Sequence, residues 1–143
     1  MTDLTFLDTA VFVASFNEID VRRRGVARGL IREALQLQRM VISEQVIAEF
    51  CREARQRFDL PMPSVRLHDY LRVVLVPLCR ARQPGPAGWH DCLDLADRWD
   101  LPLADAAIVS TAIQHGCRRL LTDRPYAGRR FGPLQCEDPF RLH

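Results

Sequence analysis

The sequence predicts a three-layer α/β/α fold with a mainly parallel central sheet of about four to five strands. Two observations lead to this prediction. Short apolar runs that end at polar residues alternate with longer segments whose apolar residues recur every three or four positions. No internal repeat or low-complexity linker interrupts this alternation. The length of 143 residues is typical of one domain, so we expect a single domain over residues 1–143.

Composition narrows the class of protein. No segment approaches the roughly 20 apolar residues of a membrane span, and the chain begins without the basic region of a signal peptide, so we expect a cytoplasmic protein with no membrane partner. The five cysteines lack C-x-x-C spacing and are expected to be buried free thiols. All 20 basic residues are arginines, which permits phosphate contacts, but the net charge of +2 does not by itself indicate a nucleic acid partner.

The first predicted strand covers residues 4–7 and ends at Asp8 and Thr9, and a helix is predicted over residues 10–16. Open α/β sheets build sites from strands that deliver a polar side chain and then turn into a helix. Asp8 could equally serve as the N-cap of that helix. The residues alone leave both interpretations open. A polar loop is predicted over residues 17–24, followed by a helix over residues 25–37.

A second strand is predicted over residues 39–43, with Ser43 as the N-cap of a helix that begins at Glu44. The apolar stripe of this helix includes Val46 and Phe50 but not Glu49. Periodicity therefore predicts an exposed Glu49, of the kind that forms ion pairs along a helix surface. Further helices are predicted over residues 64–82 and 89–99, separated by a loop rich in proline and glycine.

Residues 101–123 are predicted to form an amphipathic helix, a left-handed stop at Gly116 and a strand over residues 118–122. Asp105 lies within the apolar stripe of this helix, so its carboxylate loses hydration unless a cation, hydrogen bonds or protonation compensates. Asp123 follows the strand and is expected at the same sheet edge as Asp8. A loop is predicted over residues 124–133 and a last strand over residues 134–136.

The chemistry of this edge is predicted to be that of clustered carboxylates. Two carboxylates 4 Å apart repel by about 4 kcal/mol at an effective dielectric constant near 20, so a cluster requires a cation. Oxygen ligands suit Mg²⁺ or Mn²⁺, which can activate a water molecule in phosphodiester hydrolysis. The sequence contains no glycine-rich phosphate loop, nucleophile elbow or closely spaced histidine pair that would indicate another chemistry.

The order and spacing of five segments resemble the PIN-domain family, and within it the toxin ribonucleases of VapBC-type toxin–antitoxin pairs. The segments are FLDTAVFVASF (6–16), VISEQVIAEF (41–50), DLPLADAAIVSTAIQHGC (100–117), LLTD (120–123) and G-x-x-F-G-x-L…DPF (128–140). The resemblance implies a PIN-like fold and a Mg²⁺-dependent (or Mn²⁺-dependent) endoribonuclease that hydrolyses RNA with a metal-activated water. It also implies a cognate antitoxin partner and a homodimer.

The resemblance also identifies candidate site residues. It implies four acidic side chains that act as metal ligands and catalytic residues: Asp8, Glu49, Asp105 and Asp123. Two hydroxyls are expected to support them: Thr9 and Thr122. Three arginines are expected to hold the RNA backbone: Arg124, Arg129 and Arg130.

The last acidic motif departs from the family pattern. The family usually has Thr-any-Asp, whereas Thr122-Asp123-Arg124 puts the acid one residue early and an arginine in its usual place. Successive strand residues face opposite sides, so a continuing strand would turn Asp123 away from the metal, whereas a loop would tolerate the shift. Two other functions stay open, the first of them because of this departure. One is a catalytically weak or inactive module that binds nucleic acid or protein, and the other is an interaction domain that dimerises through apolar helices.

Overall fold

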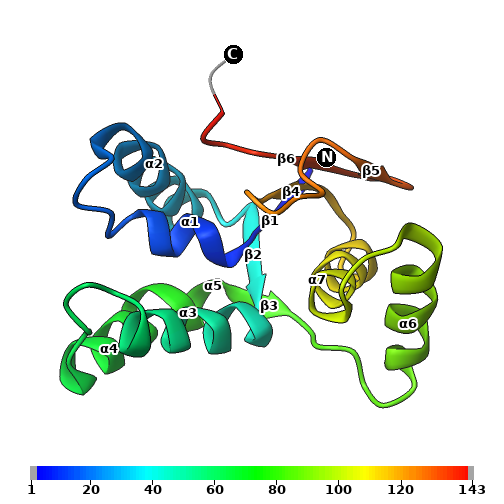
Figure 1. The fold of residues 1–143 in the computed structure, drawn as a ribbon, viewed down its shortest axis with the longest axis horizontal. Coiled ribbons are helices and arrows are strands. Elements are labelled where there is room, and N and C mark those ends of the chain that lie inside the picture. The colour runs from blue at the N-terminus through cyan, green and yellow to red at the C-terminus, as the bar shows by residue number, and fades with distance from the viewer. Residues whose placement is uncertain (1–2, 142–143) are drawn as a thin grey trace.

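The computed structural model describes residues 3–141 and contains one six-stranded sheet (Figure 1). The strands are β1 (Leu4–Leu7), β2 (Met40–Ser43), β3 (Cys79–Ala81), β4 (Cys117–Leu121), β5 (Arg130–Phe131) and β6 (Leu134–Glu137). Their order across the sheet is β3-β2-β1-β4-β6-β5. All neighbouring pairs are parallel except β5 and β6, which are antiparallel.

Helices cover both faces of the sheet. They are α1 (Thr9–Ala14), α2 (Val21–Leu37), α3 (Glu44–Gln56), α4 (Ser64–Tyr70), the π-helical turn η1 (Leu71–Leu75), α5 (Val76–Leu78), α6 (Gly88–Trp99) and α7 (Leu103–Gln114). Figure 1 shows α6 and α7 on one side of the sheet and the other helices on the opposite side. The predicted three-layer α/β/α fold with a mainly parallel sheet is confirmed, but the sheet has six strands and not the expected four to five, because the short strands β3 and β5 were not predicted. Within residues 3–141, no helix combines the length and apolar character needed to cross a membrane.

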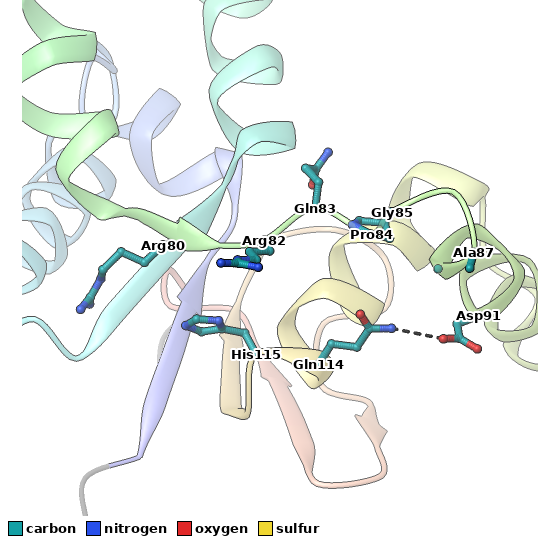
Figure 2. Close-up of a pocket in the computed structure, with 10 residues that line it drawn as sticks. Arg80, Arg82, Gln83, Pro84, Gly85, Ala87, Asp91, Gln114 and His115 are labelled. Carbon is teal, nitrogen blue, oxygen red and sulfur yellow. Dashed lines mark hydrogen bonds between the residues drawn. The ribbon is translucent and has the colours of Figure 1, made fainter.

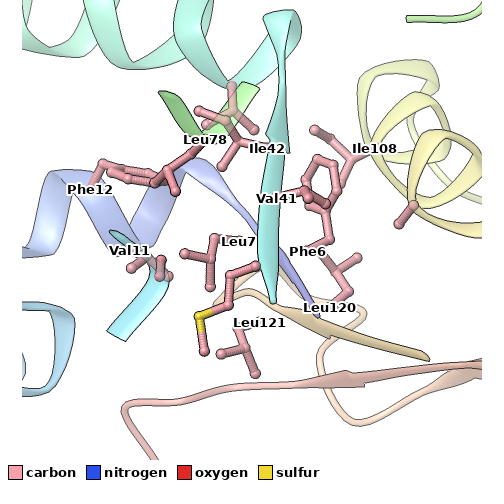
Figure 3. Packing of buried hydrophobic residues seen from close by; sticks show 14 of the residues in the cluster. Phe6, Leu7, Val11, Phe12, Val41, Ile42, Leu78, Ile108, Leu120 and Leu121 are labelled. Atoms are coloured by element: carbon pink, nitrogen blue, oxygen red, sulfur yellow. The ribbon is translucent and has the colours of Figure 1, made fainter. Parts of the chain in front are cut away.

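The core lies on both faces of the sheet. Phe6 of β1 lies on the side of Ile108 of α7, whereas its neighbour Leu7 lies on the side of Val11 of α1 (Figure 3). All four side chains are fully buried. Strands that are buried on both faces appear in a sequence as continuous apolar runs, which explains the run that predicted β1.

Three predicted segments were wrong in part. Helix α2 begins at Val21, four residues earlier than expected, because the Asp20 side chain accepts a hydrogen bond from the Arg23 backbone N–H. The helix predicted over residues 64–82 passes through a π-helical turn and ends at Leu78, and β3 follows. Pro77 cannot donate a backbone hydrogen bond, which favours this early end. The loop predicted over residues 124–133 contains the two-residue strand β5.

Helix α7 is more deeply buried than its predicted apolar stripe implied. All of its residues from Asp105 to Ala112 are buried, because the helix packs against β4 on one side and α6 on the other. Ala104, which was assigned to the stripe, is exposed. Gly116 has a φ of 82°, as expected for a left-handed residue after a helix. The helix therefore holds Asp105 at the buried edge of the sheet.

Candidate active site

Asp8 is both a helix cap and the centre of a polar cluster. Its backbone N–H donates to the Leu121 carbonyl at 3.0 Å, which continues the pairing of β1 with β4. Asp8 Oδ1 accepts from the Thr9 backbone N–H at 2.8 Å, and Asp8 Oδ2 accepts from Thr122 Oγ1 at 2.7 Å. The side chain is fully buried. The N-cap interpretation of Asp8 is therefore confirmed, and its role in a functional site stays a prediction.

Glu49 of α3 faces this cluster. Its Oε1 accepts from Thr9 Oγ1 at 2.6 Å, and its Oε2 accepts from Gln45 Nε2 at 3.3 Å. Gln45 Nε2 also donates to the Ala104 carbonyl at 2.9 Å, which connects α3 to the start of α7. Periodicity predicted an exposed Glu49. This prediction is wrong, because only 16% of the Glu49 side chain is exposed. Helical periodicity could not reveal a partner 40 residues away in the sequence.

Asp105 completes a group of three acids. It lies in the first turn of α7, where the helix dipole favours a negative charge. Its Oδ1 accepts from Arg124 Nη1 at 2.6 Å. We call Asp8, Glu49 and Asp105 the acid cluster. Its members come from the end of β1, from α3 and from α7, so the tertiary fold alone brings them together.

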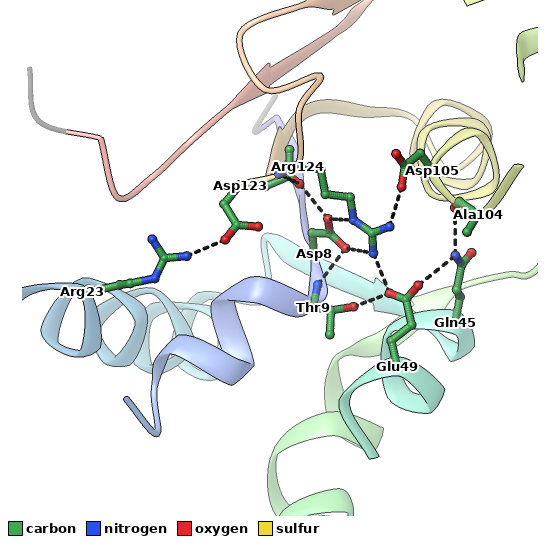
Figure 4. A network of polar contacts seen from close by, with 10 residues as sticks. Asp8, Thr9, Arg23, Gln45, Glu49, Ala104, Asp105, Asp123 and Arg124 are labelled. Atoms are coloured by element: carbon green, nitrogen blue, oxygen red, sulfur yellow. Dashed lines mark hydrogen bonds and ion pairs between the residues drawn. The ribbon is translucent and has the colours of Figure 1, made fainter. Parts of the chain in front are cut away.

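The guanidinium of Arg124 lies in the middle of the acid cluster (Figure 4). Arg124 Nε donates to Asp8 Oδ2 at 2.7 Å, and Nη2 donates to Asp8 Oδ1 at 3.1 Å, so the pair forms a two-pronged contact. Nη2 also donates to Glu49 Oε1 at 2.7 Å. All three nitrogens of one side chain thus contact carboxylates, and one cation serves three acids.

This environment determines the charge of Arg124. Burial lowers its pKa, but the Asp8 charge, hydrogen bonds to Asp8 and Asp105, and the Glu49 charge raise it by more. The pKa therefore lies above its ordinary value. Arg124 remains positively charged throughout the physiological pH range.

Asp123 lies apart from the acid cluster. Its carboxylate is exposed and forms an ion pair with Arg23 of α2, whose guanidinium also lies 4.0 Å from the centroid of the Phe140 ring. The Thr122 backbone N–H donates to the Glu137 carbonyl at 2.9 Å, so the pairing of β4 with β6 continues past Leu121. Thr122 and Arg124 accordingly face Asp8, while Asp123 between them faces away (Figure 4).

The remaining predicted residues differ in their surroundings. The Thr9 and Thr122 hydroxyls each donate to one member of the acid cluster. Arg129 packs near the rings of Trp99 and Phe131, with its guanidinium carbon 5.5 and 5.3 Å from their centroids. Arg130 is exposed. A role for Arg129 or Arg130 in RNA binding stays a prediction.

The acid cluster has the donor chemistry of a divalent cation site, because carboxylate oxygens are the ligands that Mg²⁺ and Mn²⁺ prefer. The oxygens that face its centre already accept hydrogen bonds from Arg124. Across residues 3–141, no group of three or more His, Cys, Asp or Glu side chains is arranged so that it could hold a metal ion. As observed, the acid cluster is therefore arranged around a guanidinium and not around a metal ion. Sequence reasoning missed this role of Arg124, although the arginine in the place of an acid was the available signal.

A groove of about 690 Å³ lies elsewhere, between the end of β3 and helices α6 and α7 (Figure 2). Arg80, Arg82 and His115 line one part of it. Gln114 Nε2 donates to Asp91 Oδ2 at 3.3 Å in another part. None of the predicted site residues lines this groove, and no sequence pattern indicated it.

Comparisons with known proteins agree with the observed fold. The model of the PIN domain family matches residues 5–127. No curated protein sequence matches the chain. The crystal structure of FitAcB from Neisseria gonorrhoeae is similar with a TM-score of 0.65 and 21% sequence identity, over 97% of this chain and 100% of that chain.

Two further solved structures are similar to the chain. Mycobacterium tuberculosis VapC20, a toxin that cleaves the sarcin–ricin loop, has a TM-score of 0.64 and 18% identity, over 85% of this chain and 92% of that chain. FitAB bound to an IR36 DNA fragment has a TM-score of 0.66 and 20% identity, over 98% of both chains. At these identities the structural likeness concerns the fold.

Proposed function

Because the chain belongs to the PIN domain family, we propose that it is a Mg²⁺-dependent or Mn²⁺-dependent endoribonuclease of toxin type. In this proposal Asp8, Glu49 and Asp105 bind the metal and are the catalytic acids. Asp123 is the weakest candidate for a fourth ligand, because its carboxylate pairs with Arg23. The substrate is RNA, and the protein acts in the cytoplasm.

One observation carries the proposal: three carboxylates from separate elements meet around one cation. Each pair of such acids repels by about 4 kcal/mol at 4 Å and an effective dielectric constant near 20. Buried charges that are paired in this way add little net stability compared with apolar packing. The cluster therefore adds little to the stability of the fold. This favours a functional role for it, namely to hold a cation.

The chain's own residues would act as follows. Thr9 and Thr122 keep Glu49 and Asp8 oriented through hydrogen bonds of 2.6 and 2.7 Å. A divalent cation bound by the acids would lower the pKa of a water molecule and stabilise charge on the phosphate. Arg129 and Arg130, in the segment after β4, would supply positive charge to the RNA backbone.

A cognate antitoxin and a homodimer complete the proposal. The structural neighbours support the antitoxin partner, because one of them is named as a toxin and two as FitAcB or FitAB. The homodimer rests on the family resemblance alone. Co-expression with the product of an adjacent small gene is expected to relieve growth inhibition by this protein. Relief by an unrelated small protein would count against a cognate antitoxin.

Asp105→Asn tests the catalytic proposal most cleanly. Asp105 contacts Arg124 through one oxygen, so the amide disturbs the fold less than a change at Asp8. We expect the rate of metal-dependent cleavage of single-stranded RNA to fall by at least about 100-fold, with the circular dichroism spectrum unchanged. Asp69→Asn, which neutralises an exposed acid on α4, is the matched control and should cleave normally. Full cleavage by an Asp8→Asn, Asp105→Asn double variant would refute the proposal.

A second candidate function is favoured by the position of Arg124. Because its guanidinium already contacts every member of the acid cluster, the protein could instead be a catalytically weak or inactive module that binds nucleic acid or protein. Metal titration separates the two functions. Intact RNA binding without Mg²⁺ or Mn²⁺ binding at millimolar concentration would favour the module.

A further inference from the structure

We propose that Arg124 is a built-in cation that closes the acid cluster, and that a divalent metal binds there only by exchanging with its guanidinium. The inference rests on the proposed function in one respect, namely that the acid cluster is the metal site. It adds a mode of regulation. The protein itself supplies the competitor that keeps the metal out.

The first argument is geometric. Arg124 makes four hydrogen bonds of 2.6 to 3.1 Å to the acid cluster, through both oxygens of Asp8, Oε1 of Glu49 and Oδ1 of Asp105. A metal ion at the centre of the cluster would use these same oxygens. An oxygen that faces a guanidinium nitrogen at this distance has no room for a metal ion between them. At the centre of the acid cluster the two cations therefore exclude each other.

The second argument is electrostatic. Three carboxylates around one guanidinium leave a net charge of −2, so the cluster still attracts cations. A divalent ion placed beside the guanidinium would be repelled by it at short range, in surroundings that screen charges less than water does. Exchange avoids this repulsion. It also brings the net charge of the cluster to −1, because the ion carries one more positive charge than the arginine that leaves.

The third argument concerns how Arg124 could leave. Its backbone is held on both sides, since its N–H donates to Thr122 Oγ1 at 3.1 Å and its carbonyl accepts from the Ala127 N–H at 2.9 Å. About 20% of its side chain is exposed, whereas the Asp8 side chain is fully buried. The guanidinium can thus reach solvent by side-chain rotation alone. The Thr122 hydroxyl continues to hold Asp8 after Arg124 has left.

Titration with Mn²⁺ tests the exchange. Mn²⁺ alone is titrated by calorimetry, at constant ionic strength, into the full-length wild type, Arg124→Gln and Arg119→Gln. Arg119 is the matched control, because it lies on β4 and pairs with the exposed Glu137, so its loss removes the same charge without touching the cluster. We expect Arg124→Gln to bind Mn²⁺ at least about tenfold more tightly than the wild type. Arg119→Gln should bind like the wild type. Equal affinities of Arg124→Gln and the wild type, or no binding by either, would overturn the proposal.

A second variant keeps the test decisive if Arg124→Gln does not fold without metal. Lysine at this position keeps the charge, but its compact ammonium lacks the planar fork that contacts three acids at once. Arg124→Lys is therefore expected to bind Mn²⁺ more tightly than the wild type, by a smaller factor than glutamine gives. An affinity equal to or weaker than that of the wild type would overturn the proposal.

RNA cleavage, measured on the same samples, separates this inference from the proposed function. Tighter Mn²⁺ binding by Arg124→Gln without cleavage by any variant would refute the nuclease and leave the exchange standing. Equal Mn²⁺ affinities together with cleavage by the wild type would refute the exchange alone.

Discussion

Two neighbouring residues just after β4 form ion pairs in contrasting environments. Arg124 contacts the acid cluster, where Asp8 is fully buried and the exposed fractions of the Glu49 and Asp105 side chains are 16% and 13%. Asp123 pairs with Arg23 on the other side of the segment, where the side chains are 35% and 28% exposed. Both are contacts between an arginine and a carboxylate. Their different burial predicts different consequences for stability and for metal binding.

The difference shows that shifting an acid by one residue along the chain changes which side chain enters the site. Because alternation continues past the last residue of β4, the position that faces the acid cluster belongs to Arg124 and not to Asp123. The Asp123 carboxylate lies instead in the exposed ion pair with Arg23, which we call the surface pair. A cation occupies the place where the family's motif usually puts an acid.

The largest expected effect is at Asp8. Asp8→Ala leaves Arg124 Nε and the hydroxyl of Thr122 without their buried acceptor, and should lower the free energy of unfolding by about 3–5 kcal/mol. Asp123→Ala, the matched change in the surface pair, should cost at most about 1 kcal/mol. Urea denaturation measures both. Equal losses would mean that burial does not separate the two regions.

Removal of Arg124 should have the next largest effect, and one that depends on metal. Without divalent ions, Arg124→Gln leaves three acids to repel one another and should lower the free energy of unfolding by about 2–4 kcal/mol. Mn²⁺ at 100 times its Kd should restore about 2.7 kcal/mol. Thermal unfolding with and without Mn²⁺ measures this. A loss that Mn²⁺ does not reduce would contradict the exchange.

A smaller effect is expected from the hydroxyl that supports Asp8. Thr122→Val removes the donor to Asp8 Oδ2 and the acceptor of the Arg124 N–H, and should cost about 1–3 kcal/mol. Thr111→Val is the matched control, because the buried Thr111 hydroxyl has no hydrogen-bond partner within residues 3–141. Its removal should be close to neutral. A Thr122→Val loss no larger than that of the control would exclude a supporting role for the hydroxyl.

The surface pair should contribute least. Arg23→Gln is expected to change the free energy of unfolding by about 0–1 kcal/mol, since exposed ion pairs gain little over solvated charges. The change should shrink as salt is added. Denaturation at low and high ionic strength measures it. A change of more than about 2 kcal/mol, insensitive to salt, would place this pair in the same class as the acid cluster.

Alkaline pH should leave the contribution of Arg124 unchanged. Burial lowers its pKa, but the Asp8 charge, hydrogen bonds to Asp8 and Asp105, and the Glu49 charge raise it by more, so its pKa in the folded protein exceeds that in the unfolded chain. Its stabilisation is then fully present below the unfolded pKa and is lost only as the pH rises through the folded pKa. The difference in unfolding free energy between wild type and Arg124→Gln should therefore be equal at about pH 7 and about pH 10. A smaller difference at the higher pH would contradict this.

Local patterns in the sequence predicted the framework and part of the site. Apolar runs located β1, β2, β4 and β6, and the carboxylates of Asp8 and Asp105 drew attention because one ends a strand and the other lies in an apolar helix. The strand β3 was missed because its three residues continue the apolar spacing of the preceding helices. Local patterns indicate which residues are buried. They do not indicate which elements pack against a helix such as α7, which is buried on all sides from Asp105 to Ala112.

Other contacts of the site could not be predicted because they join distant parts of the chain. Glu49 meets Thr9 across 40 residues, and Arg124 meets Asp8 across 116. Only the family resemblance pointed to Glu49. For Arg124 the resemblance indicated an unusual residue, and strand alternation explains which way it faces. Its carboxylate partners become evident only in the folded protein, where the end of β1, α3 and α7 meet at one edge of the sheet.

The most direct measurement follows the Arg124 side chain itself. In ¹⁵N–¹H NMR spectra, the Nε–H signal of Arg124 can be assigned by its absence from Arg124→Gln. Without divalent ions we predict slow hydrogen exchange at this group, because it donates to the buried Asp8 carboxylate at 2.7 Å. Saturation with Mg²⁺ should remove this protection as the guanidinium moves into solvent. A protected Arg124 Nε–H signal in protein with Mg²⁺ bound at the acid cluster would contradict the account.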